Sequence, residues 1–222
     1  MSKNGKRTLR PVKFLEDADM VGSRRSDHSD ADWHMLLLDL NRDARLFASK
    51  TPGHFHLIVD ADMTWVAYKR LLKALVKAGV VEKAWVDANT HVGQMVLATG
   101  DKTGALVDQL GSYKQVSEHV YSGYDSWTET YLKETPLNRS AYIGSRKKDS
   151  KRHMLLLDLD RATELHESRH PGHQHLVVDT RMTWPQYKRA LKAFEKAGLI
   201  SWQQFEAARA SKQTYLTKSR SA

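Results

Sequence analysis

In two separate stretches of the chain, short apolar runs precede an amphipathic helical pattern. Residues 35–40 (MLLLDL) form an apolar run of strand length that turns polar at its end, and residues 54–60 (HFHLIVD) form a second run. Residues 154–159 and 173–179 contain the same pair of runs. A segment containing Pro-Gly separates the two runs of each pair, so we expect two β-hairpins, each with a long connecting loop.

A helix is predicted directly after each second apolar run. Thr64 stands at the N-cap position, apolar residues follow at the spacing of one helix face, and the pattern stops at Gly79. The later stretch shows the same features from Thr183 to Gly198. Pro185 falls in the first turn of this second helix, where its missing N–H costs no hydrogen bond.

The two stretches are copies of one internal repeat. When the chain is shifted by 119 positions, residues 34–81 align with residues 153–200 without a gap, and 29 of the 48 positions are identical by count. Agreement of this extent indicates a tandem duplication. We expect a first unit over residues 12–99, a linker containing one helix over residues 100–131, and a second unit over residues 132–219.

The predicted element order within a unit is β-β-α-β-β, because residues 83–99 contain two further short apolar runs around a glycine turn. This order favours a small antiparallel sheet that is covered on one face by a helix. The expected fold class is therefore α+β, built as a tandem duplication of a ferredoxin-like or RRM-like unit.

The charge of the chain narrows the range of partners. The 35 Lys and Arg residues exceed the 26 Asp and Glu residues by nine, which favours nucleic acid as a polyanionic partner ahead of an anionic membrane surface. No apolar run approaches the roughly 20 residues of a membrane span, and residues 1–10 show no signal peptide, so we expect a cytoplasmic protein. The absence of cysteine excludes disulfides, thiolate zinc sites and a cysteine nucleophile.

Basic residues gather in two kinds of segment. Each predicted helix carries lysines spaced by four, which places them on one helix face, at Lys69, Lys73 and Lys77 and again at Lys188, Lys192 and Lys196. These stripes fit contact with a phosphate backbone, and an ordinary solvated helix face is the alternative. Residues 146–153 form a basic loop that fits phosphate contact or plain solvation, and it includes Arg146, Lys147 and Lys148.

Acidic and histidine side chains meet at the end of the second predicted hairpin. Side chains alternate along a strand, so Asp158 and Asp160 share one face, and His173 and His175 share a face of the next strand. The hairpin would bring all four to one end of the sheet. Carboxylates suit Mg²⁺ or Mn²⁺ and imidazoles suit Zn²⁺, so these four residues are candidate metal ligands. Turn stabilisation without any metal is the alternative.

The first copy offers a weaker version of this group. It has Asp39, His54 and His56, but Asn41 stands where the second copy has an acid. An amide is a poorer cation ligand than a carboxylate, so we expect the better site in the second copy.

The order of LLLDLD, a short gap, then Pro171-Gly172-His173-x-His175 and an apolar strand resembles the archaeo-eukaryotic primase superfamily. That resemblance implies an RRM-like core, catalytic metals held by Asp158 and Asp160, and a contact from His175 to a nucleotide phosphate. It further implies a metal-dependent enzyme of nucleotidyl transfer or phosphodiester chemistry. The chain also resembles small uncharacterised proteins of actinobacteria and their phages.

Two other functions remain open at this point. The motif at residues 54–59 also resembles the HUH pattern of rolling-circle and relaxase endonucleases, in which two histidines hold a divalent ion and a helix tyrosine attacks DNA. Tyr68 and Tyr187 are the corresponding tyrosines, but they fall on the apolar helix stripe, so we expect them in the core. The remaining possibility is a non-catalytic, phage-type accessory protein that binds DNA or a protein partner in replication, recombination or host takeover.

Overall fold

The structure is a computed structural model that describes residues 20–25, 33–49, 53–90, 93–98, 142–146 and 151–217. The elements of the first repeat are β1 (Met20–Gly22), β2 (Trp33–Leu40), β3 (Ala44–Ala48), β4 (Phe55–Thr64), α1 (Trp65–Ala78), α2 (Lys83–Thr90) and β5 (Val96–Ala98). Those of the second repeat are β6 (Tyr142–Gly144), β7 (Arg152–Leu159), β8 (Thr163–Glu167), β9 (Gln174–Thr183), α6 (Trp184–Lys196), α7 (Trp202–Ser211) and β10 (Tyr215–Thr217). The helix expected within residues 100–131 lies outside the described residues.

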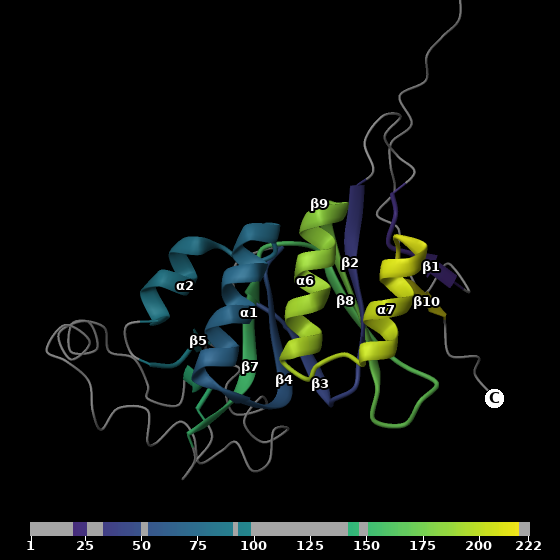
Figure 1. Cartoon of the computed structure of the whole chain (residues 1–222). Coiled ribbons are helices and arrows are strands. Elements are labelled where there is room, and N and C mark those ends of the chain that lie inside the picture. Colours follow the sequence, from purple (N-terminus) through teal and green to yellow (C-terminus); the bar gives the residue numbers. More distant parts are fainter. Residues whose placement is uncertain are drawn as a thin grey trace, which may run out of the picture.

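The expected α+β class is confirmed, but the strand pairing differs from the expected hairpins. One three-stranded antiparallel sheet has the order β2-β9-β8, and another has the order β3-β4-β7. The prediction that β2 pairs with β4, and β7 with β9, is therefore wrong. Each sheet combines one strand of one repeat with two strands of the other, as Figure 1 shows in its mixed colours.

The residues between the two apolar runs explain the wrong pairing. They hold a five-residue strand in each repeat, β3 or β8, which pairs with the following long strand, β4 or β9. The intervening strand occupies one edge of β4, so the other edge is available to β7 of the second repeat. Apolar pattern fixes which face of a strand is buried but does not choose its neighbour.

Pairing between strands of different repeats, which we call strand exchange, also occurs in two short ladders. Strand β1 of the first repeat pairs with β10 of the second, and β5 of the first repeat pairs with β6 of the second. The amino-terminal strands of each repeat thus complete the sheets formed by the rest of the other repeat. The unit boundaries 12–99 and 132–219 describe the sequence repeat, whereas each three-stranded sheet draws on both units.

Residues 83–99 also differ from the prediction of two strands. They form helix α2 followed by a single strand, β5, and the corresponding segment of the second repeat forms α7 and β10. Ser201 caps α7, since its hydroxyl accepts from the N–H of Gln204 at 3.1 Å. Short apolar runs do not distinguish a buried helical turn from a strand.

The predicted long helices are confirmed, together with their end signals. Thr64 caps α1 by accepting from the N–H of Ala67, and α1 ends at Gly79, whose φ of 70° is readily available only to glycine. In α6, Pro185 lies in the first turn as predicted. The side chain of Gln186 accepts from the N–H of Thr183 to complete the start of this helix.

Helices α1 and α6 lie side by side and form one layer over the sheets (Figure 1). The side chain of Gln186, at the start of α6, donates to the carbonyl of Lys77 at the end of α1 (3.3 Å), so the two helices run in opposite directions. A continuous apolar core joins both helices to both sheets. A smaller cluster, which includes Leu37, Val177 and Leu216, packs β10 against the opposite face of the β2-β9-β8 sheet.

Candidate functional site

Strand exchange divides the predicted group of acids and histidines between two places. Asp158 of β7 lies opposite His56 of β4, with 3.7 Å between its Oδ1 and His56 Nε2. His54 Nδ1 is 3.9 Å from the same oxygen. We call Asp158, His54 and His56 the Asp158 cluster.

The equivalent residues form a second group on the other sheet. Asp39 of β2 lies opposite His175 of β9, and its Oδ1 is 3.7 Å from His175 Nε2. His173 Nδ1 lies 3.4 Å from the same oxygen. We call Asp39, His173 and His175 the Asp39 cluster. In both clusters the carboxylate comes from one repeat and the imidazoles from the other.

The catalytic trio expected from the primase resemblance is therefore not assembled. Asp158 belongs to one cluster and His175 to the other, and this is a correction to the predicted hairpin site. Asp160 lies just past the end of β7, where its Oδ1 is 3.6 Å from Nε of Arg161. Asp179, which follows His175 on β9, forms an ion pair with Arg25.

Asn41 has a structural role that the comparison of copies did not reveal. With its amide nitrogen turned toward the end of α6, Asn41 donates to the carbonyls of Gly198 (3.0 Å) and Leu199 (2.9 Å). These carbonyls follow the last turn of the helix, where backbone acceptors lack helical partners. At the end of α1, Arg161 Nε donates to the Gly79 carbonyl at 3.1 Å. Asn41 thus caps the end of α6.

The two clusters differ on the third strand of each sheet. His166 of β8 lies opposite His175, and its Nε2 is 2.8 Å from Oε2 of Glu164. In the other sheet the residue opposite His56 is Phe47, and Arg45 occupies the place that corresponds to Glu164. The Asp39 cluster therefore has a third imidazole and a second carboxylate beside it, and it is the richer of the two. All the histidines of this group come from the second copy, where the sequence predicted the better site, but the aspartate beside them is Asp39 and not Asp158.

Burial favours the neutral form of the inner histidines, His56 and His175. Burial lowers the pKa of His175, an effect that the Asp39 carboxylate opposes and that His166, His170 and His173 reinforce. Burial likewise lowers the pKa of His56, against the opposing effect of Asp158. Neutral imidazole has a free lone pair, so these rings are suited to accept a hydrogen bond or to bind a cation.

Several polar atoms of the clusters lack a hydrogen bond. Among the described residues, Oδ1 of Asp39 and of Asp158 and Nδ1 of His173 and of His175 are buried without a hydrogen-bond partner. The side chain of His175 is only 7% exposed. Within this part of the chain, no group of three or more His, Asp or Glu side chains is already arranged to hold a metal ion.

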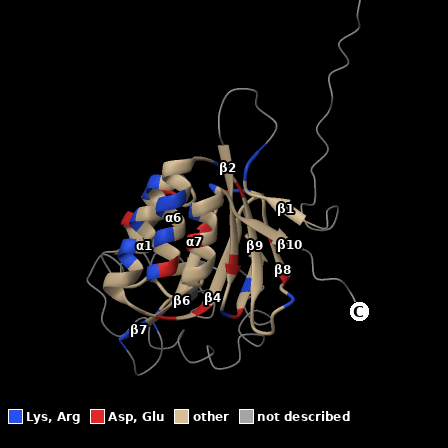
Figure 2. Cartoon of the chain, turned by 45° about the vertical axis from the view of Figure 1, so that its right-hand side comes forward, with Lys and Arg blue, Asp and Glu red and all other residues tan. Residues whose placement is uncertain are grey.

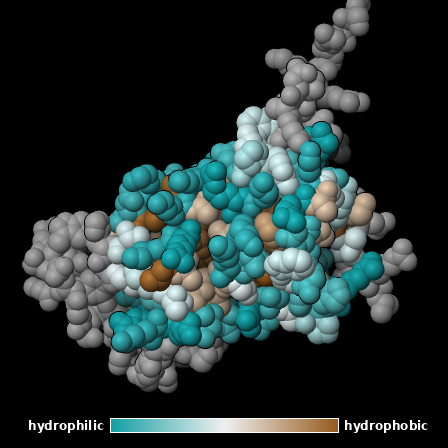
Figure 3. Space-filling model, viewed as in Figure 1, coloured by the Kyte–Doolittle hydropathy of each residue, from teal (hydrophilic) through white to brown (hydrophobic). Residues whose placement is uncertain are grey.

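The predicted lysine stripes lie on the outer side of the helix layer. The basic residues of α1 and α6 are exposed except for Lys192, which is partly buried, and they appear as blue patches on these helices in Figure 2. The space-filling view of this side shows mostly hydrophilic surface with smaller apolar areas between (Figure 3). The helix set comprises Lys69, Arg70, Lys73, Lys77, Lys188, Arg189, Lys192 and Lys196, against one acid, Glu195.

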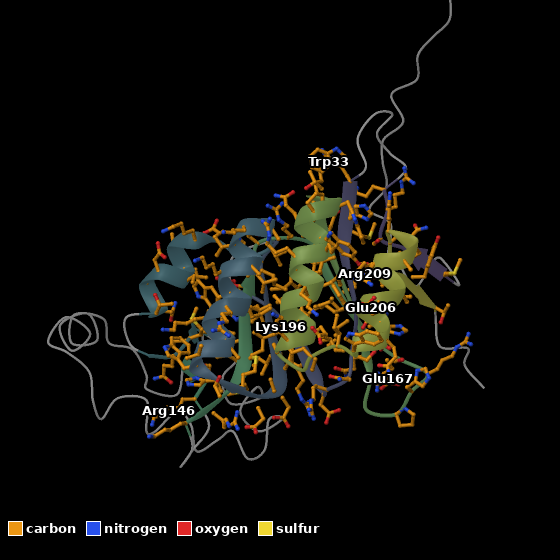
Figure 4. The ribbon with its side chains drawn as sticks, in the orientation of Figure 1. Trp33, Arg146, Glu167, Lys196, Glu206 and Arg209 are labelled. Atoms are coloured by element: carbon orange, nitrogen blue, oxygen red, sulfur yellow. The ribbon has the colours of Figure 1, made fainter. Side chains whose placement is uncertain are left out.

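The basic loop at residues 146–153 was the other predicted basic group, and Arg146 at its start does not lie on the outer face of α1 and α6. Arg146 follows β6, where it pairs with His153 in an isolated bridge, and Figure 4 places it well apart from Lys196 of α6. Lys147 and Lys148 lie outside the described residues. Beside α6, Arg209 and Glu206 of α7 form an ion pair of 2.6 Å, so α7 adds little net charge to the layer.

Tyr68 and Tyr187 are core residues, as their position on the apolar stripe predicted. Both are fully buried. The Tyr68 hydroxyl donates to the carbonyl of Leu156 (2.7 Å) and accepts from its N–H (2.8 Å), and Tyr187 donates to the carbonyl of Leu37 (3.2 Å). These hydroxyls form hydrogen bonds with the backbones of β7 and β2. Because they are buried, they are not placed for attack on DNA.

Each repeat contains a buried pair of a serine and a histidine that was not predicted from the sequence. Ser23 Oγ lies 3.2 Å from Nδ1 of His34 and accepts from the N–H of Thr214, and Ser145 makes the same contacts with His153 and Met95. The only available signal was the recurrence of Gly-Ser-Arg upstream of each His-Met-Leu-Leu-Leu run. These pairs join β1 to β10 and β6 to β5.

No protein-family model matches this chain, and neither a curated protein nor a solved structure shows significant similarity to it. None of the helices in the described residues is long and apolar enough to cross a membrane.

Proposed function

We propose that this protein binds nucleic acid through the outer face of the α1 and α6 layer. The observation that carries the proposal is the density of positive charge on two adjacent helices, which carry eight basic residues and one acid. In water a cation stripe of this kind binds a phosphate backbone by releasing condensed counterions. The excess of nine positive charges over the whole chain acts in the same direction.

The antiparallel packing of the helices supports this proposal. It places two lysine stripes next to each other on one side of the molecule, one from each repeat. Lys192 is the most constrained member, since its Nζ is 3.0 Å from Glu195 Oε2 and 4.6 Å from the centre of the Phe205 ring. Among the described residues, Lys73, its counterpart in α1, makes no ion pair. The α1 stripe is therefore expected to contribute more binding than the α6 stripe.

We propose binding and not nucleotidyl transfer. The Asp39 cluster shares a face of its sheet with Leu37 and Val177, whereas α6 covers the opposite face. A phosphate held by the lysines would therefore lie across the sheet from these carboxylates and imidazoles. The non-catalytic accessory protein is thus favoured over the primase-like enzyme, with the tandem duplication supplying the second stripe.

The test is the dependence of affinity on salt. We expect the wild type to bind a fluorescent DNA duplex with an affinity that falls steeply as salt rises, and the triple variant Lys69→Ala, Lys73→Ala and Lys77→Ala to reduce the slope of log K against log salt by about three. Parallel titrations with single-stranded DNA and with RNA identify the preferred polymer.

A control variant removes the same number of positive charges elsewhere. Lys83→Ala, Lys151→Ala and Arg209→Ala changes three exposed residues that lie outside α1 and α6. If the two triple variants flatten the slope equally, binding follows net charge alone and the helix layer is not the binding face. If the wild type binds none of the three polymers, the proposed function is wrong.

A further inference from the structure

We propose that the Asp39 cluster, together with His166, binds one transition-metal ion of the zinc type. This inference is independent of nucleic-acid binding, because it concerns the opposite face of the sheet. Imidazole nitrogens with a single carboxylate suit Zn²⁺ and the neighbouring divalent metals, whereas Mg²⁺ and Ca²⁺ prefer oxygen ligands. The donor set therefore favours zinc chemistry over the Mg²⁺ or Mn²⁺ expected from two aspartates.

The spacing of the donors fits an ion between them. Zinc bonds of about 2.0 to 2.1 Å in tetrahedral geometry place neighbouring ligand atoms about 3.3 Å apart. The separations of Asp39 Oδ1 from His173 Nδ1 and His175 Nε2 are 3.4 and 3.7 Å. Neither pair is hydrogen-bonded within the described structure, and Asp39 Oδ1 is buried without a partner. Leaving a buried carboxylate oxygen unpaired is costly, and a bound cation would remove that cost.

The strands hold most of this group rigidly. Asp39, His175 and His166 lie opposite one another on β2, β9 and β8, so they form a row across one face of the sheet. His173 precedes β9 and its side chain is 33% exposed, so it is less enclosed than His175. A small rotation of this ring is the adjustment that would close the group around an ion, since the described side chains are not yet arranged to hold one.

Glu164 strengthens the case for His166 as a ligand. His166 Nε2 is engaged with Glu164 Oε2 at 2.8 Å, which leaves Nδ1 as the nitrogen with a free lone pair. Metal-binding histidines usually have their second nitrogen held by a carboxylate or carbonyl in this way, which fixes the tautomer and the ring orientation. The Asp158 cluster has Phe47 and Arg45 at these places, so it lacks both the extra ligand and its support.

The experiment is a titration of the untagged full chain, freed of metal with a chelator, with Zn²⁺ by calorimetry and with Co²⁺ by visible absorption. We expect one tight ion per chain and the absorption bands of low-symmetry Co²⁺. Asp39→Asn and His166→Phe should each weaken binding by about tenfold or more, and Glu164→Gln by about 10- to 100-fold. His166→Phe introduces the residue type that the other sheet has at this place, Phe47.

The Asp158 cluster provides the matched control. Asp158→Asn should leave the affinity and the stoichiometry unchanged, and Phe47→His combined with Arg45→Glu should add a second ion. Far-ultraviolet circular dichroism of each variant separates loss of the site from loss of the fold. The proposal is overturned if the wild type binds neither ion, or if Asp39→Asn and Asp158→Asn affect folded protein alike, because binding would then be absent or spread over surface histidines.

Discussion

At the scale of single residues, the structure assigns different roles to side chains that look alike in the sequence. Of the histidines that recur in both copies, His34 and His153 are buried against serines and aromatic rings, and His175 faces a carboxylate. The His34 ring stacks on Tyr187 with 5.1 Å between their centres, and His153 lies 5.0 Å from Trp65. Their recurrence at the 119-residue spacing marks these histidines as candidates for a structural or functional role. The role of each one depends on its burial and its neighbours in the fold.

Burial of His153 makes folding sensitive to acid. Burial, reinforced by the charge of Arg146, lowers the pKa of His153 from its ordinary 6.5 to about 4. The unfolded chain therefore binds this proton more readily between these two values, and stability should be complete above about pH 6.5 and should fall as pH decreases toward 4. The lowered pKa values of His56 and His175 act in the same direction.

We expect His153→Phe to reduce this acid sensitivity. Phenylalanine keeps an aromatic ring beside Trp65 but cannot take up a proton, so the loss of melting temperature between pH 7 and pH 5 should be smaller than in the wild type. Thermal melts followed by circular dichroism at both pH values give the comparison. An equal loss in the two proteins would show that His153 does not titrate on unfolding in this range.

At the scale of elements, the residues that begin and end helices predicted α1 and α6 well. The apolar runs predicted strands but not which strands pair. Thr64, Gly79 and Pro185 act through local hydrogen bonding or local backbone conformation, so their effect can be predicted from neighbouring residues alone. Strands β3 and β8 mix polar and apolar residues over five positions, which hides them within an apparent loop. Their presence changes which strand becomes the neighbour of β4 and β9.

Helix α1 also supplies hydrogen bonds to the edge of an exchanged strand. The Tyr68 hydroxyl satisfies both the carbonyl and the N–H of Leu156 on β7, which has β4 on its other side. Burial raises the pKa of the Tyr68 hydroxyl, so it stays protonated and able to donate. An edge strand with unpaired backbone groups in the core would be costly, and Tyr68 prevents this at Leu156.

We expect Tyr68→Phe to lower the free energy of unfolding by about 1 to 3 kcal/mol, because it leaves two buried backbone groups of Leu156 without a partner. Urea denaturation of the full chain measures the change. Tyr215→Phe is the control, since Tyr215 is 49% exposed and its replacement should alter stability by less than about 0.5 kcal/mol. Equal effects of the two changes would show that the Leu156 contacts do not contribute.

At the scale of the whole molecule, the repeats are interlocked. The elements β2, β3, β4 and β5 recur as β7, β8, β9 and β10 with both bounds shifted by 119 residues. The offset was visible in the sequence, and it predicted the order of the long elements in the second copy once the first was assigned. It could not predict exchange, because a strand with the same apolar pattern fits the β4 or the β9 edge equally well.

Exchange also determines where the candidate chemistry lies. Asp39 and Asp158 each lie beside two histidines at a strand end, but not beside the histidines of their own repeat that the sequence predicted. Their histidine partners come from the other repeat, and this depends on the pairing of strands that are distant in the sequence. The asymmetry between the clusters arises from His166 and Phe47, which lie on strands that the sequence analysis did not identify.

The most direct test of this interlocked arrangement is disulfide formation in a chain that has no cysteine of its own. Thr64 and Arg152 lie directly opposite each other on β4 and β7, whereas Thr183 lies opposite Trp33. Opposed residues of antiparallel strands are about 4.5 to 5.5 Å apart between Cα atoms, which is within the range of a disulfide.

Two variants should therefore behave differently under mild oxidation and non-reducing peptide mapping. Thr64→Cys with Arg152→Cys should form an intramolecular disulfide, and Arg152→Cys with Thr183→Cys should remain reduced. The variants are matched, because each removes Arg152 and one threonine that precedes a helix. Cross-linking of residues 152 and 183, with residues 64 and 152 left reduced, would show that each repeat pairs its own strands and would contradict the exchanged fold.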